Sequence, residues 1–196
     1  PSRSPVLLVH SFAANKSNWL YLARDLRAAG FGRVDALNYN PFTLDIPGLA
    51  AACARRARQL AEATGSPKVH LVGHSLGGII ARYAVQLCGL ADVAATCVTV
   101  ASPHGGVGHL PCGWAPIRSV RQLTPGSPVL ARLRASSRPL PTRFVAYYSN
   151  LDLLVPGQRA RITEPALQAT NVLIKDEGHT AILLSRRLSS SLLHEL

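Results

Sequence analysis

Six short apolar runs recur along the chain, and amphipathic segments lie between them. A run that is apolar at nearly every position is typical of a strand buried on both faces of a parallel sheet. Strands of this kind that alternate with helices are characteristic of a doubly wound α/β fold. The sequence therefore predicts about six mostly parallel strands with helices on both faces of the sheet. The predicted strands are residues 5–9, 33–39, 68–73, 94–102, 143–149 and 169–175.

The segments between these runs have helical spacing and carry signals for helix ends. Asp45 is placed to cap the start of one helix, and Gly65 suits the left-handed position at its end. Ser127 followed by Pro128 is a second start signal, because proline is favoured in the first turn. The predicted helices are residues 18–30, 45–65, 76–89, 127–134 and 180–193, the last as one continuous closing helix.

Length and composition favour one globular domain over residues 1–196. Apolar residues make up 47% of the chain and charged residues 16%, which excludes a disordered composition. No apolar run approaches the ~18 residues that a membrane helix requires. There is no repeat, no interdomain linker and no insertion long enough for a large cap domain. The one long irregular segment, residues 103–126, has the length of a functional loop.

The net charge of +11 raises the question of whether the protein binds nucleic acid or another anionic partner. The basic residues are scattered through the predicted helices, without a basic tail or a block of like charges. This pattern favours a solvated basic surface over a nucleic-acid site, so we expect no specific nucleic-acid partner. Peripheral contact with an anionic lipid surface or a charged polymer stays open as an alternative.

The four cysteines do not indicate a metal site. Cys53, Cys88, Cys97 and Cys112 lack the spacing of zinc ligands and have no paired histidines nearby, so no metal is expected. They allow three disulfide connectivities, which stay open. Cys97 lies in a predicted buried strand, where an ordinary apolar thiol is expected.

The sequence Gly73-His74-Ser75-Leu76-Gly77 stands between a predicted strand and a predicted helix. Glycine two residues before and after a serine at such a junction is the pattern of a nucleophile elbow, in which a strained turn projects the serine above the sheet. Gly73 and Gly77 are required because strand and helix pass close to each other. A glycine-rich turn without chemistry is the weaker interpretation. We predict that Ser75 is a catalytic nucleophile.

A serine nucleophile needs a base and an acid that orients the base. Enzymes with this elbow place the three residues in the chain order serine, acid, histidine. His179 follows the last predicted strand, and Asp152 follows the strand before it, so these two are the predicted base and acid. Asp176 lies too close to His179 along the chain to reach across the ring, and Asp45 is better explained as a helix cap.

The negative charge of a tetrahedral intermediate requires two preorganised N–H donors. We predict that the backbone N–H groups of Leu76 and Phe12 supply them, although Phe12 could instead be only a wall of the pocket. Aromatic and polar side chains in loops at the same edge of the sheet could line a substrate groove or serve ordinary packing. These candidates are Phe12, Tyr39, Phe42, His104 and Trp114.

Several of these segments together resemble the α/β-hydrolase superfamily, and within it the small bacterial lipases and esterases of actinobacterial type. The resemblance covers essentially the whole chain and is carried by PVLLVHSF, HLVGHSLGGIIARY, VASPHGG, QLTPGSPVLARL, SNLDLLVP and EGHTAIL. One departure is Ser11, which stands where the family usually has glycine after the histidine of the first loop.

The resemblance implies a fold and an activity. It implies a minimal α/β-hydrolase fold and hydrolysis of lipid-like or other hydrophobic carboxylic esters. Ser75, Asp152 and His179 would form the triad, an acyl-enzyme would be the intermediate, and no metal or organic cofactor would be needed. Thioesterase, polyester hydrolase and acyltransferase activities are alternatives on the same triad, and a non-catalytic binding protein is a more distant one. The resemblance also implies export, so we expect a secreted protein, and we expect a monomer.

Overall fold

The computed structural model describes residues 3–12, 14–108 and 116–196. Its centre is one six-stranded sheet in the order β2-β1-β3-β4-β5-β6, and every pair of neighbouring strands is parallel. The six apolar runs therefore form the six predicted strands. Their bounds are β1 Val6–Val9, β2 Val34–Leu37, β3 Val69–His74, β4 Ala94–Val100, β5 Arg143–Tyr148 and β6 Thr170–Leu173.

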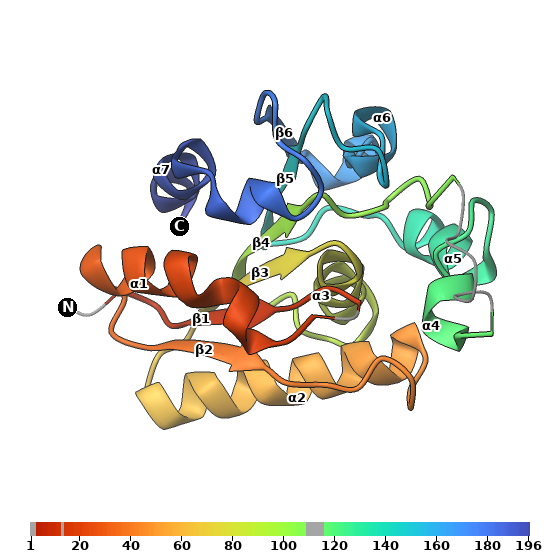
Figure 1. Cartoon of the computed structure of the whole chain (residues 1–196). Helices are drawn as coiled ribbons and strands as arrows, with labels where there is room; N and C mark the ends of the chain where they lie inside the picture. Colours follow the sequence, from red (N-terminus) through yellow and green to blue (C-terminus); the bar gives the residue numbers. More distant parts are fainter. Residues whose placement is uncertain (1–2, 13, 109–115) are drawn as a thin grey trace.

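Helices cover both faces of this sheet (Figure 1). Helices α1 (Leu20–Ala28) and α7 (Arg186–Glu195) share one apolar core with the sheet, and α2 (Ile46–Thr64) and α3 (Leu76–Leu87) share the core on the other face. The doubly wound arrangement predicted from the alternating pattern is confirmed. The smaller elements are α4 Arg118–Arg121, α5 Pro128–Ala135, α6 Gly157–Ala160, and the 3-10 turns η1 Lys16–Trp19, η2 Pro165–Leu167 and η3 Ala181–Leu184.

The predicted helix ends are found where the capping signals stand. The side chain of Asp45 accepts a hydrogen bond from the backbone N–H of Gly48 at the start of α2, and Gly65 ends that helix with φ of 62°. Ser127 caps α5 in the same way, with Pro128 in the first turn. None of the helices in the described part of the chain combines the length and apolar character needed to cross a bilayer.

The closing helix differs from its prediction. Residues 180–193 form two elements, η3 and α7, because Ser185 between them is extended, with φ of −70° and ψ of 123°. Ile182 and Leu183 of the first turn are buried in the core that also contains Leu188 and Leu192 of α7. The break lets both short elements turn their apolar side chains to the same core. The predicted irregular segment 103–126 contains the short helix α4, and its residues 109–115 lie outside the described part.

Candidate active site

Ser75 stands alone between the last residue of β3 and the first residue of α3. Its φ of 53° is in the left-handed region, which a non-glycine residue adopts only under strain. Its glycine neighbours are needed for space, because a Cβ on Gly73 would lie 2.4 Å from the carbonyl oxygen of Gly77. A Cβ on Gly77 would lie 2.1 Å from the carbonyl oxygen of Val9. The local geometry is that of the predicted elbow.

The structure brings Ser75, His179 and Asp152 into one hydrogen-bonded chain. His179 Nε2 lies 3.0 Å from Ser75 Oγ, and His179 Nδ1 lies 2.7 Å from Asp152 Oδ2. A carboxylate can only accept, so Nδ1 carries the ring hydrogen and Nε2 accepts from the serine hydroxyl. This is the tautomer in which a histidine can remove the proton of a serine nucleophile.

The carboxylate of Asp152 is held on its second oxygen as well. Asp152 Oδ1 accepts hydrogen bonds from the backbone N–H groups of Leu154 at 3.0 Å and Val155 at 2.8 Å. The side chain is almost fully buried, with Oδ1 held by the loop after β5 and Oδ2 by His179. The loop after β5 therefore orients Asp152 through contacts that do not involve His179.

A second contact joins the loop of the acid to the loop of the histidine. Asn150 Oδ1 accepts from the backbone N–H of Asp176 at 2.7 Å, and Asn150 Nδ2 donates to the Asp176 carboxylate at 3.1 Å. Asp176 thus serves to connect the two loops rather than to orient His179. Nothing in the sequence pattern singles out Asn150 for this role, because its partner is 26 residues away.

The two predicted oxyanion donors lie on segments that pack against each other. Leu76 is the first residue of α3, so its backbone N–H has no acceptor inside the helix. Phe12 follows β1, and the end of β1 lies beside the elbow, with Val9 opposite Gly73. The carbonyl oxygens of Val9 and His10 are the atoms nearest a Cβ added to Gly77. The first loop therefore passes directly beside Ser75.

The candidate groove residues have different surroundings. The Phe12 and Phe42 rings contact each other with centroids 5.5 Å apart, and Phe42 is 65% exposed, so this pair can form an apolar wall. Tyr39 instead stacks on His10 at 4.0 Å, and its hydroxyl donates to the His10 carbonyl oxygen at 2.5 Å. Tyr39 thus holds the first loop in place, a role that the sequence did not reveal. Trp114 lies outside the described residues.

His104 is a correction to the predicted groove. Its side chain lies in the interior, where Nδ1 accepts from Arg82 Nη1 at 3.2 Å and Nε2 donates to Thr99 Oγ1 at 2.9 Å. Arg82 is itself fully buried and forms an ion pair with Glu164 at 3.0 Å. Burial, with the charge of Arg82 added, lowers the pKa of His104 well below its ordinary value. Both ring nitrogens are used inside the protein, so none is left for a substrate.

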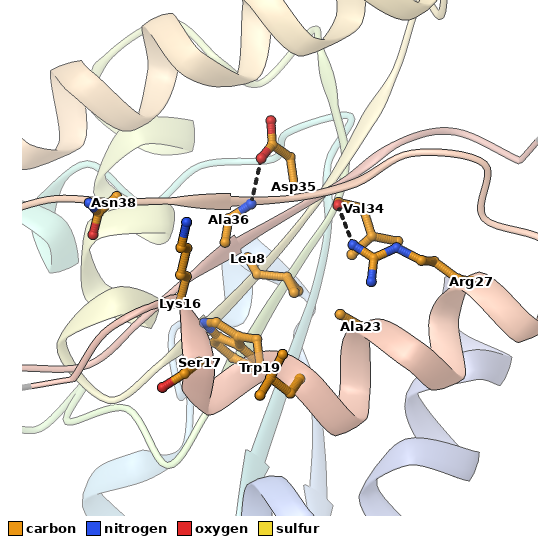
Figure 2. A pocket seen from close by; sticks show the side chains of 11 residues that line it. Leu8, Lys16, Ser17, Trp19, Ala23, Arg27, Val34, Asp35, Ala36 and Asn38 are labelled. Carbon is orange, nitrogen blue, oxygen red and sulfur yellow. Dashed lines mark hydrogen bonds between the residues drawn. The ribbon is translucent and has the colours of Figure 1, made fainter.

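A hollow of about 390 Å³ lies between α1 and the edge strand β2 (Figure 2). Its lining combines apolar side chains with a few polar groups, but it contains no serine–histidine pair. Arg27 Nη2 donates to the Val34 carbonyl oxygen at 3.2 Å, and Asp35 Oδ1 accepts from the backbone N–H of Ala36 at 2.9 Å. These two charged side chains protect the free edge of the sheet. The serine–histidine pair lies at the elbow and not in this hollow.

The cysteines and the other titratable groups add no second chemical site to the described part of the chain. Cys53, Cys88 and Cys97 are free there, and burial raises the pKa of the Cys97 thiol to about 12. Cys97 is thus the inert apolar thiol that its strand predicts, and Cys112 lies outside the described residues. No three histidine, cysteine or acidic side chains gather within the described residues in a way that could hold a metal ion.

Comparison with known families agrees with this geometry. The model of the alpha/beta hydrolase family matches residues 6–187. The chain belongs to the alpha/beta hydrolase family. Two solved structures show how closely this hydrolase follows the fold. The mature form of lipase BlEst2 from Bacillus licheniformis has a TM-score of 0.81 at 20% identity over 98% of this chain and 93% of that chain. A monoacylglycerol lipase from Paleococcus ferrophilus has a TM-score of 0.69 at 14% identity over 99% and 94%.

Two curated relatives of this hydrolase carry the name triacylglycerol lipase. The protein from Pseudarthrobacter phenanthrenivorans is 31% identical over 113 residues, and the protein from Burkholderia plantarii is also 31% identical over 113 residues. These matches cover 54% of this chain in both cases. They span 34% and 31% of the two relatives, about a third of their length.

Proposed function

We propose that this alpha/beta hydrolase is a serine-dependent carboxylic ester hydrolase of the lipase or esterase type. The observation that carries the proposal is the unbroken chain from Ser75 Oγ through His179 to Asp152, at 3.0 and 2.7 Å, on a strained elbow. A buried, aligned set of nucleophile, base and acid is what acyl transfer to a serine requires. The names of the two curated relatives support the same reaction class.

The reaction would proceed in two stages. Ser75 Oγ attacks the ester carbonyl carbon while His179 Nε2 takes the hydroxyl proton, and Asp152 stabilises the imidazolium that forms. The backbone N–H groups of Leu76 and Phe12 would hold the oxyanion. His179 then gives its proton to the leaving alkoxide, which departs as the alcohol. Water, deprotonated by His179, then attacks the acyl-enzyme. As the bond to Ser75 Oγ breaks, His179 returns the proton to Oγ, which releases the carboxylic acid and the free serine.

The exposed apolar side chains favour lipid-like substrates. Among the described residues, these side chains lie in segments that follow the carboxyl ends of strands, or at the carboxyl end of β6 itself. Ser75 also follows the carboxyl end of a strand, so they share its end of the sheet. Apolar exposure concentrated on one edge is typical of a surface that meets lipid or another apolar partner. The most exposed is Leu153, at 95%. The full set is Leu20, Tyr21, Phe42, Leu44, Leu151, Leu153, Leu173 and Leu184.

Hydrolysis of p-nitrophenyl esters of increasing chain length, followed with wild type and Ser75→Ala, tests the proposal. We expect measurable turnover in wild type and loss of nearly all of it in Ser75→Ala, with thermal melting unchanged. Ser66→Ala, in the turn before β3, is the matched serine control and should keep full activity. Turnover that survives in Ser75→Ala would refute the serine mechanism.

The assignment of the acid can be tested separately. Asp152→Asn should lower kcat by about 10⁴-fold, because an amide no longer selects the required tautomer of His179. Asp45→Asn is the matched control, since asparagine caps a helix as well as aspartate does, and it should leave kcat unchanged. Equal losses in the two variants would contradict the assignment of Asp152.

A further inference from the structure

His74, the residue before the nucleophile, lies in direct contact with the proposed base. It is the last residue of β3 and is 1% exposed. Its Nε2 lies 2.8 Å from the backbone carbonyl oxygen of His179. Its ring centroid is 5.0 Å from the His179 ring, and the two planes are inclined by 40°. The strand that delivers Ser75 therefore touches both the backbone and the ring of the residue that must activate Ser75.

The chemistry of the contact fixes the state of His74. A carbonyl oxygen only accepts, so His74 Nε2 must carry a hydrogen and donate it. Burial lowers the pKa of His74 to about 3, so the ring is neutral in the neutral pH range. Its Nδ1 is buried and meets no partner among the described residues. A neutral neighbour matters here, because a second positive charge beside His179 would oppose formation of the imidazolium.

We propose that His74 is a positioning residue for His179: its Nε2–H fixes the backbone of the base, and its ring supports the imidazole at hydrogen-bonding distance from Ser75. The inference rests on the proposed function, because it assigns the role of His74 in that reaction. Asp152 holds Nδ1 of the base and cannot by itself fix the backbone that carries the ring. His74 supplies this second point of attachment, from the strand that ends at the nucleophile.

Three variants separate positioning from a structural role. His74→Leu keeps similar volume and removes the donor, whereas His74→Gln places an amide N–H near the position of Nε2. His70→Leu removes another buried histidine of the same strand, at the end remote from the site. We expect kcat for a p-nitrophenyl ester to fall about 10- to 100-fold in His74→Leu, with KM within twofold of wild type. His74→Gln should recover most of kcat, and His70→Leu should keep it.

A second readout does not depend on turnover. The His179 Nδ1–H that is shared with Asp152 should give a downfield proton resonance in NMR spectra of wild type. We expect this resonance to weaken or disappear in His74→Leu, to return in His74→Gln, and to persist in His70→Leu. Loss of the resonance in His74→Leu would show that His179 has moved away from Asp152. This readout is independent of whether wild type hydrolyses any of the esters.

The outcomes distinguish the two proposals. Full kcat and an unchanged resonance in folded His74→Leu would overturn the positioning role and leave the ester hydrolase proposal intact. The role is also overturned if His74→Gln is as impaired as His74→Leu, since the donor would then be irrelevant. An inactive wild type in which the resonance still depends on His74 would refute the hydrolase proposal and support the positioning contact.

Discussion

Four of the described histidines are buried, and three of them, His70, His74 and His104, have a strongly lowered pKa that makes the stability of this fold depend on pH. Burial also lowers the pKa of the fourth, His10, which acts in the same direction. His70, His74 and His104 are 7%, 1% and 5% exposed. Burial lowers the pKa of His70 to about 4 and of His74 to about 3, and it lowers the pKa of His104 well below its ordinary value. In the unfolded chain each ring regains a pKa of about 6.5. Below that pH the unfolded state therefore binds more protons than the folded state, and stability falls as pH falls.

The size of this effect can be calculated from the difference in proton binding. At pH 5 an unfolded histidine is about 97% protonated, whereas these three rings stay almost entirely neutral in the folded protein. Integration from pH 7 to pH 5 gives a loss of about 2 kcal/mol for each histidine, or about 6 kcal/mol for the three together. The loss depends little on how far below 5 the folded pKa lies. The summed loss is similar in size to the whole free energy of unfolding of an ordinary domain, which is about 5–15 kcal/mol.

Urea unfolding followed by circular dichroism at pH 7, 6 and 5 measures this loss. The control is His70→Leu, which removes one of the three rings. His70 lies in β3, at the end of the strand remote from Ser75. Its free energy of unfolding should fall by about 2 kcal/mol less than that of wild type between pH 7 and pH 5. A wild type that loses under about 1 kcal/mol over this range would refute the reasoning, as would a pH dependence that His70→Leu leaves unchanged.

Two further predictions concern the supports of the site. Gly77→Ala should abolish both soluble expression and labelling of Ser75 by a fluorophosphonate, because the new Cβ would lie 2.1 Å from the Val9 carbonyl oxygen. Gly178→Ala, where no atom lies within 4 Å of the new Cβ, should keep both, and equal behaviour of the two variants would contradict the close approach. Arg82→Leu should lower the free energy of unfolding by about 3–5 kcal/mol at pH 7, since it removes the ion-pair partner of the mostly buried Glu164 carboxylate. In urea unfolding, a loss below about 1 kcal/mol would show that the ion pair is not needed.

The strands could be predicted because a strand buried on both faces of the sheet is apolar at consecutive positions, and this pattern is visible within the strand itself. In β1 all four residues are both buried and apolar, so the run can be recognised without knowledge of its neighbours. The closing segment could not be predicted in the same way. Residues 180–193 have one helical pattern, but the core receives Ile182 and Leu183 from a 3-10 turn and Leu188 and Leu192 from α7. The break at Ser185 follows from packing against other elements, which a periodicity does not contain.

The same distinction between local patterns and tertiary contacts applies to the residues of the candidate site. Ser75, Asp152 and His179 could be selected because each stands just after a predicted strand and their chain order is restricted. The place of His104 in a loop after β4 suggests a groove residue, yet its neighbour Arg82 lies 22 residues earlier and is buried. His74 gave no signal beyond its place in the elbow, since the carbonyl that it contacts is 105 residues away. Contacts of this kind depend on tertiary structure and have no local pattern.

The contacts around His179 and the candidate walls of the groove come from different strands. His179 is held by His74 at the end of β3 and by Asp152 in the loop after β5, and the loops after β5 and β6 are joined by Asn150. The contact between Phe12 and Phe42 belongs instead to the segments after β1 and β2. Substitutions after β1 and β2 can therefore change the shape of the groove while the geometry around His179 is kept. Phe12 has two roles in the proposed mechanism, because its backbone N–H would hold the oxyanion and its ring contacts Phe42, a candidate wall of the groove. In the proposed mechanism, acyl preference and rate are therefore most directly coupled at this position.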